Sequence, residues 1–151
     1  MRSKPVILAL RLALGAVFLY AAYTKLRQEW LVFALSIDAY QLLPSWAVFA
    51  VARWLPWVEL IIGALLLIGR LLGVVAPMAT MLLLGFYGAM LYAYRGGGGI
   101  DCGCFGVGEQ VSAATLLRDG ALLTISIALS ALVLWHSRLS QSRLLPAEAG
   151  Q

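Results

Sequence analysis

Long apolar runs separated by short polar segments dominate the pattern of this chain. Four runs stand out, at residues 5–24, 45–69, 71–94 and 115–136. Each is near the roughly 20 apolar residues that a helix needs to cross the hydrocarbon of a bilayer. Inside lipid, a helix is one of the few structures that satisfies its own backbone hydrogen bonds. The pattern therefore predicts four membrane-spanning helices packed as a bundle.

The connections between these runs are short, which predicts a single membrane domain. Between the first two spans, residues 28–43 place Trp30, Phe33, Ile37 and Tyr40 at helical spacing. This pattern predicts a short helix lying at the membrane surface. A connecting loop with aromatic anchors fits it equally well. The connection at residues 95–112 is rich in glycine and is not expected to be helical.

The composition agrees with a membrane location. Hydrophobic residues make up 62% of the chain, charged residues 12%, and the mean hydropathy is +0.90, whereas a soluble domain carries about 25% charged residues. The chain is therefore expected to be an all-α, multi-pass protein of the lipid bilayer. The net charge of +4 is explained by basic ends, so no nucleic-acid partner is expected.

The charged residues also predict an orientation. Basic residues mark both tails, and acidic residues gather on the opposite side: Glu29, Asp38, Asp101, Glu109 and Asp119. The positive-inside tendency then places both termini in the cytoplasm of a cell with a bacterial-type inner membrane. It places the 95–112 loop outside, where disulfide chemistry is sustained.

Both cysteines of the chain lie in that loop, at Cys102 and Cys104, in the segment DCGCFG at residues 101–106. Two thiols one residue apart can close into a strained disulfide, and strained disulfides are the labile kind. One thiol can attack a partner's disulfide while the other resolves the mixed disulfide. We therefore expect Cys102 and Cys104 to be the catalytic residues of a redox site.

Other interpretations of the pair remain open. A structural bridge across one residue would constrain little chain. Two thiolates can bind a soft metal, but a closed zinc site needs four ligands and the only histidine, His136, is expected at the other membrane face. A flexible linker that happens to hold both cysteines is the last alternative.

Several charged residues are expected near the depth of the loop. Lys25, Arg118 and Asp119 are candidates for a polar floor under the cysteines, where they would stabilise a thiolate or bind the carbonyl oxygens of a quinone. Asp101, beside Cys102, would oppose thiolate formation. Arg27 and Arg53 are expected to reach the membrane interface as ordinary snorkelling residues.

Two further predictions concern residues within the spans. Glu59 lies inside the second span, where an ionisable side chain must be paired or protonated, and helix rise places Arg11 at a similar depth. We predict an Arg11–Glu59 pair, with Glu59 as a structural or proton-handling group. A second set, Tyr87, Tyr92 and Tyr94, could line a quinone pocket, although tyrosines commonly anchor helices at the interface.

Four segments together resemble the MauE/DoxX-like group of small four-helix membrane proteins. They are GAVFLYAAYTK at 15–25, LPWVELIIG at 55–63, DCGCFG at 101–106 and the pair Arg118-Asp119. The cysteine segment is the specific one and favours the MauE side. The resemblance implies a four-helix bundle associated with redox metabolism, in a branch linked to disulfide formation during maturation of a periplasmic enzyme.

The plan is also similar to membrane thiol oxidoreductases that pass electrons between a thioredoxin-like protein and quinone. Those enzymes generally have two cysteine pairs and this chain has one, so the acceptor is either quinone directly or a second dithiol protein. We therefore predict a membrane thiol–disulfide oxidoreductase with an extracytoplasmic thioredoxin-like partner and quinone as a candidate cofactor. The alternatives are a non-enzymatic maturation or assembly subunit and a soft-metal carrier.

Overall fold

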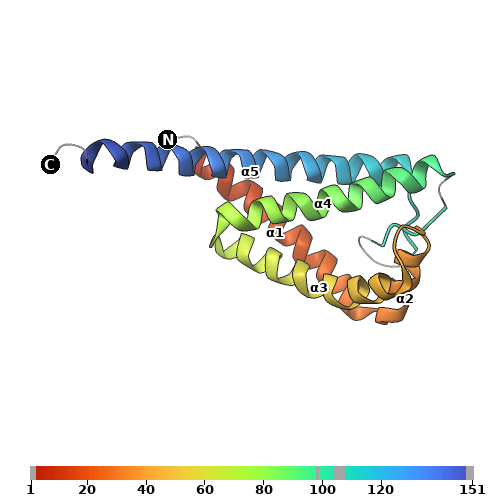
Figure 1. Cartoon of the computed structure of the whole chain (residues 1–151). Helices are drawn as coiled ribbons and strands as arrows, with labels where there is room; N and C mark the ends of the chain where they lie inside the picture. Colours follow the sequence, from red (N-terminus) through yellow and green to blue (C-terminus); the bar gives the residue numbers. More distant parts are fainter. Residues whose placement is uncertain (1–2, 98, 104–107, 149–151) are drawn as a thin grey trace.

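The computed structural model describes residues 3–97, 99–103 and 108–148. These residues form five helices: α1 (Ser3–Arg27), α2 (Trp30–Asp38), α3 (Ser45–Ile68), α4 (Leu72–Arg95) and α5 (Ala113–Glu148) (Figure 1). Four of the helices are long and apolar enough to span a membrane, over Lys4–Arg27, Ser45–Ile68, Leu72–Arg95 and Ala113–Arg138. The predicted four-span helical bundle is confirmed, with α2 as the short helix between the first two spans.

The last helix is longer than expected. The apolar run ends at residue 136, but α5 continues through the polar residues that follow, to Glu148. Those residues include no glycine, and no proline before Pro146, so nothing in the sequence stops the helix once it has begun.

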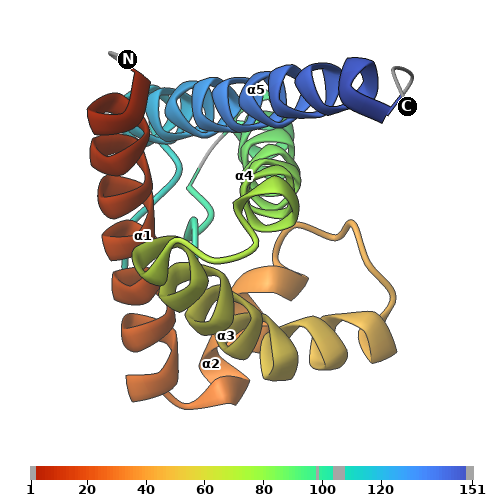
Figure 2. The same cartoon turned by 90° about the vertical axis from the view of Figure 1, so that its left-hand side faces the viewer.

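The helices pack as two pairs that meet side by side. α1 packs mainly on α3 and α4 mainly on α5, while α2 lies against α3 and α1 also contacts α5 (Figure 1, Figure 2). We call the end that holds α2 and the α4–α5 connection the loop end. The opposite end, with the start of α1 and the turn between α3 and α4, is the tail end.

Two glycines bring α1 and α3 into close contact. A Cβ atom on Gly15 would lie 2.8 Å from Leu67 Cδ2 and 3.1 Å from the Gly63 carbonyl oxygen. A Cβ atom on Gly63 would lie 3.0 Å from Leu19. Small residues at such positions let helix backbones approach closely in a membrane, where apolar burial alone gives little preference for helix over lipid. This contact sets the register between α1 and α3.

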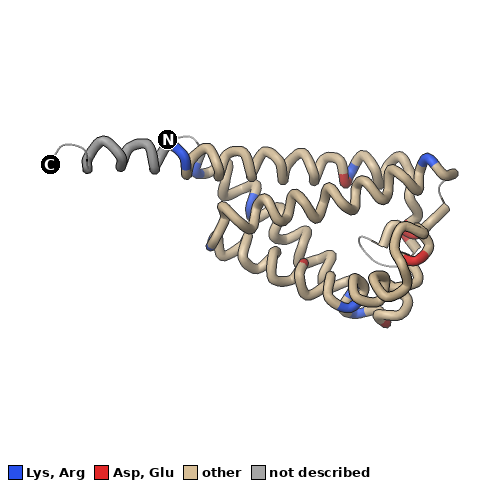
Figure 3. Tube along the Cα trace, in the orientation of Figure 1, with Lys and Arg blue, Asp and Glu red and all other residues tan. Residues whose placement is uncertain are grey.

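The surface is apolar along the spans and charged near their ends. Large side chains such as Met81 and Leu117 are 71% and 77% exposed, as expected for residues that face lipid. Lys, Arg, Asp and Glu gather toward the two ends of the bundle, and few lie along the spans (Figure 3). The buried core between α1, α3, α4 and α5 contains Leu14, Phe18, Leu66, Ala76 and Leu129.

Candidate functional site

The described parts of the α4–α5 connection pair with each other as a short hairpin. The Val111 amide donates to the Ile100 carbonyl at 2.9 Å, and the Cys102 amide donates to the Glu109 carbonyl at 2.7 Å. Asp101 and Gln110 form an antiparallel bridge between them. Cys102 therefore sits in a paired backbone, which argues against a flexible linker at this residue. Cys104 lies outside the described residues.

The hairpin packs on α2 beside the chain that leaves that helix. The Tyr40 hydroxyl donates to the Cys102 carbonyl at 3.2 Å, and Cys102 is only 6% exposed. Gly103 has a φ of +66° in the left-handed region, and a Cβ atom there would lie 3.4 Å from the ring of Phe33. The residue between the two cysteines must therefore be small and tolerant of positive φ.

Replacing Gly103 by alanine is expected to lower the free energy of unfolding by about 1–2 kcal/mol, the usual cost of a left-handed backbone at a residue with a Cβ atom. The new methyl group would only touch the Phe33 ring, but the strained backbone directly beside Cys102 should loosen the hairpin there, so Cys102 should react faster with a maleimide reagent. Gly108→Ala is the matched control, because Gly108 has a φ of +94° but open space around it. Equal maleimide rates in the two variants would contradict this effect of the Gly103 backbone on Cys102.

A series of charged side chains extends from the Cys102 thiol, each in contact with the next. Cys102 Sγ donates to Glu109 Oε2 at 3.6 Å, and the other Glu109 oxygen pairs with the Arg118 guanidinium. Arg118 Nε also donates to Asp119 Oδ1 at 3.0 Å. Glu109 and Arg118 are 36% exposed, whereas the side chain of Asp119 is 8% exposed. The arrangement places a carboxylate at the thiol and a guanidinium immediately behind it.

The start of α5 holds these groups in place. The Ser112 amide donates to Thr115 Oγ1 at 2.8 Å, and the Thr115 amide donates to Ser112 Oγ at 3.3 Å. This reciprocal pattern is a capping box, which fixes the first turn of a helix. Because Arg118 and Asp119 follow one turn later, the cap also fixes where they meet the hairpin.

The structure brings together part of the predicted polar floor. Glu109 links Cys102 to Arg118, which in turn contacts Asp119. From the sequence, Glu109 was predicted only to be one of the acidic residues on the outer side. Asp101 is next to Cys102 in the chain, but successive residues in an extended strand point to opposite faces. The hairpin therefore turns Glu109, rather than Asp101, toward the thiol. The apolar residues Ile100 and Val111 on either side of a glycine-rich segment were the signal that could have predicted it.

Glu59 pairs with Lys25, so the predicted Arg11–Glu59 pair is wrong. Lys25 Nζ lies 3.0 Å from Glu59 Oε1, and the two side chains are 0% and 2% exposed. Lys25 Nζ also lies 5.6 Å and 5.7 Å from the ring centroids of Phe33 and Phe86, within the range of cation–π attraction. Lys25 on α1 thus contacts α2, α3 and α4.

Arg11 lies farther toward the tail end, against the end of α3. A Cβ atom on Gly69 would lie 1.5 Å from an Arg11 guanidinium nitrogen, and Gly69 is the residue that ends α3. A cation at this position is favoured by the partial negative charge of a helix C-terminus. The depth estimate failed because it counted from the start of each helix and ignored the register set by Gly15 and Gly63.

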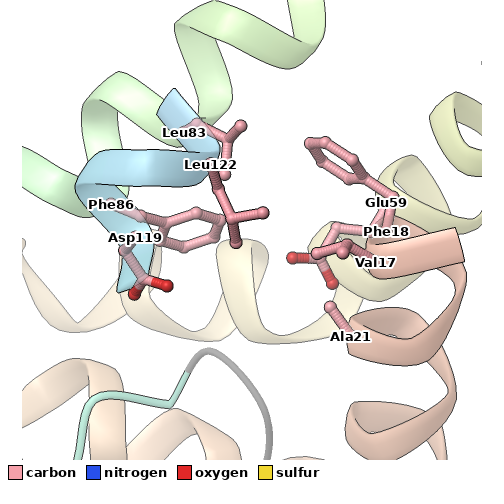
Figure 4. Close-up of a pocket in the computed structure, with 8 residues that line it drawn as sticks. All are labelled: Val17, Phe18, Ala21, Glu59, Leu83, Phe86, Asp119 and Leu122. Atoms are coloured by element: carbon pink, nitrogen blue, oxygen red, sulfur yellow. The ribbon is translucent and has the colours of Figure 1, made fainter. Parts of the chain in front are cut away.

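A small cavity separates the Lys25–Glu59 pair from the charges near the hairpin. Its volume is about 30 Å³, and Glu59 on α3 and Asp119 on α5 reach it from opposite sides between apolar side chains (Figure 4). Glu59 Oε2 is buried with no hydrogen-bond partner among the described residues. The cavity is large enough for one water molecule. The charged groups of α1 and α3 are therefore close to those of α5 without a direct ion pair.

A larger apolar pocket of about 410 Å³ lies at the loop end, between α2, α3, α4 and the hairpin. Cys102 and Gly103 form part of its wall. Of the tyrosines in the part of the chain that the structure describes, Tyr40 lines the pocket. Tyr87, Tyr92 and Tyr94 do not line it. Tyr87 packs near Gly120 on α5, and the other two are 61% and 45% exposed, so this pocket does not have the tyrosine lining suggested from the sequence.

His136 lies on the part of α5 that runs toward the tail end and is exposed. Because α5 begins beside the hairpin at Ala113 and runs to the tail end (Figure 1), His136 lies in the part of this helix that is away from the hairpin. Within the described residues, which leave out Cys104, no three His, Cys, Asp or Glu side chains are grouped to hold a metal ion.

Comparisons with known proteins support one family. The family model described as "Methylamine utilisation protein MauE" matches residues 3–136. The chain is 34% identical over 131 residues to the methylamine utilization protein MauE of Paracoccus denitrificans, an alignment that covers 84% of this chain and 70% of the relative. No solved structure matches the chain.

Proposed function

This chain belongs to the MauE family of membrane proteins, and we propose that it is a membrane thiol–disulfide oxidoreductase. Cys102 and Cys104 cycle between a dithiol and a disulfide, and an extracytoplasmic thioredoxin-like protein is the exchange partner. The termini lie in the cytoplasm, and the hairpin faces outward from a bacterial-type inner membrane. By the name of its Paracoccus relative, the context of this activity is methylamine utilisation.

The observation that carries this proposal is the placement of the Cys102 thiol. A thiol that only packs in an apolar core needs no charged neighbours, but Cys102 Sγ donates to a carboxylate that is itself held by Arg118. Thiol–disulfide exchange moves a proton whenever a thiol becomes a thiolate or the reverse. Glu109 is placed to accept that proton, and Arg118 is placed to stabilise the negative charge that remains.

The exchange proceeds in two steps that balance. A thiolate of the reduced partner attacks one sulfur of the Cys102–Cys104 disulfide, forming a mixed disulfide and releasing the other cysteine as a thiolate. The partner's second thiolate then attacks the mixed disulfide and leaves with its own disulfide closed. Two electrons have passed to the chain, and the two protons that the partner's thiols lost on becoming thiolates are taken up by Cys102 and Cys104, which end as thiols.

Single serine substitutions test this proposal. Because the exchange is reversible, the cysteine left in one of Cys102→Ser and Cys104→Ser should attack the disulfide of the oxidised partner, and no second cysteine of the chain can then displace it. This variant should accumulate a dithiothreitol-sensitive mixed disulfide in membranes, visible on a non-reducing gel and identified by mass spectrometry as a thioredoxin-fold protein. The double variant is the control and should trap nothing. If neither single variant traps a partner and the double variant keeps full activity in cells, the chain is instead a non-enzymatic assembly subunit. Stoichiometric binding of a thiophilic metal, lost in both single variants, would favour a metal carrier.

A further inference from the structure

The apolar pocket at the loop end opens toward the surface that faces lipid. Met81 on α4, together with Leu42 and Leu43 after α2, lines it, and these residues are 71%, 47% and 42% exposed. None of the described residues in its lining is charged. Its volume of about 410 Å³ lies in the range of small-molecule sites. A hydrophobic molecule dissolved in the bilayer therefore has a direct route to it.

The lining of the pocket combines a redox-capable group with aromatic side chains. Cys102, Phe33 and Phe86 all line it. Both rings separate the pocket from Lys25. An uncharged planar ring fits among aromatic side chains, which prefer stacked or edge-to-face contacts. An anionic or strongly polar oxidant would lose its hydration there without gaining charged partners.

We infer that this pocket binds a lipid-soluble quinone that reoxidises the cysteine pair, an inference that rests on the proposed function. The thiols of Cys102 and Cys104 lose two electrons and two protons and form one S–S bond. The quinone takes up both electrons and both protons and leaves as the hydroquinone. The carboxylate of Glu109, at 3.6 Å from Cys102 Sγ, holds the first proton on its way to the ring oxygen.

Two glycines of α4 provide a matched test of binding. Gly85 lines the pocket and Gly88 does not, and a Cβ atom at either position meets no atom within 4 Å. Gly85→Phe should fill the pocket without strain, whereas Gly88→Phe adds the same side chain elsewhere on the same helix. The probe is a short-chain azido-ubiquinone, photolysed with the protein in lipid nanodiscs and competed with decylubiquinone. We expect labelled α3 and α4 peptides, with labelling at least tenfold weaker in Gly85→Phe than in Gly88→Phe.

The inference would be overturned if decylubiquinone did not reduce the labelling, or if the two variants were labelled equally. Either result would mean that the probe reaches the protein only from the surrounding lipid, without a specific site. The redox step is measured separately, as the absorbance change of decylubiquinone mixed with prereduced protein. Wild type and Gly88→Phe should reduce it, with Gly85→Phe about tenfold slower and Cys104→Ser inactive. Competed labelling without any reduction would overturn quinone as the oxidant. Failure of partner trapping alone would overturn the exchange partner and leave the binding result standing.

Discussion

Replacing Lys25 by methionine is expected to lower the free energy of unfolding of the bundle by about 3–5 kcal/mol, the cost of leaving one member of a buried ion pair without its partner. The Glu59 carboxylate would then lie inside a span with no counter-charge. The same change removes the cation from between the rings of Phe33 and Phe86, so contacts of α1 with three other helices are lost together. Unfolding by sodium dodecyl sulfate titration from a mild detergent gives the measurement.

Two variants make this result specific. Arg53→Met removes an exposed cation from the same helix as Glu59 and should change the free energy of unfolding by no more than about 0.5 kcal/mol. The double variant Lys25→Met/Glu59→Leu should recover most of the loss, because no buried charge then remains unpaired. Equal stability of Lys25→Met and Arg53→Met would show that the ion pair does not hold the bundle together.

Replacing Glu109 by glutamine is expected to shift the alkylation of Cys102 toward lower pH. With Cys104→Ser as background, Cys102 is the only thiol, and its rate with iodoacetamide follows the thiolate fraction. A negative charge about 4 Å away costs a thiolate at least about 1 kcal/mol even in water, so its removal should lower the pH of half-maximal rate by about one unit. The 3.6 Å contact between Cys102 and Glu109 makes this the largest electrostatic effect expected at the hairpin.

The opposite charge should give the opposite shift. Arg118→Gln removes the cation behind Glu109, so the pH of half-maximal alkylation should rise. Asp101→Asn is the control for acidic residues near Cys102 in the chain, and its shift should be smaller than that of Glu109→Gln because Asp101 lies on the other face of the hairpin. A larger shift for Asp101→Asn would mean that the hairpin pairing is not maintained in the membrane.

The four spans were predictable because each apolar run is long enough to decide its own structure. The length of a run and its lack of charge require no knowledge of neighbouring helices. The predicted boundaries at residues 45 and 94 lie within one residue of the start of α3 and the end of α4. The pairing of Glu59 did depend on neighbours. It is set by the close approach of Gly15 and Gly63, which shifts α1 along α3 so that Lys25, rather than Arg11, reaches Glu59.

The cysteines could be singled out from the sequence, but their surroundings could not. Glu109 reaches Cys102 through pairing of their backbones, and residues seven apart in a glycine-rich segment give no periodic signal of such a contact. Tyr40 is likewise distant in sequence and meets the hairpin only because α2 folds back on α3. The sequence therefore predicts the cysteine pair as the redox group, and the fold gives Cys102 its charged neighbour and its apolar pocket.

The redox state of Cys102 and Cys104 in native membranes shows whether the pair cycles between dithiol and disulfide. Free thiols are tagged with a maleimide that adds mass, with and without prior reduction by dithiothreitol. We expect some chains to carry no tag before reduction and two tags after it. The fraction of such chains should grow when decylubiquinone is added to reduced membranes. Two tags on every chain under all of these conditions would contradict a cycling disulfide.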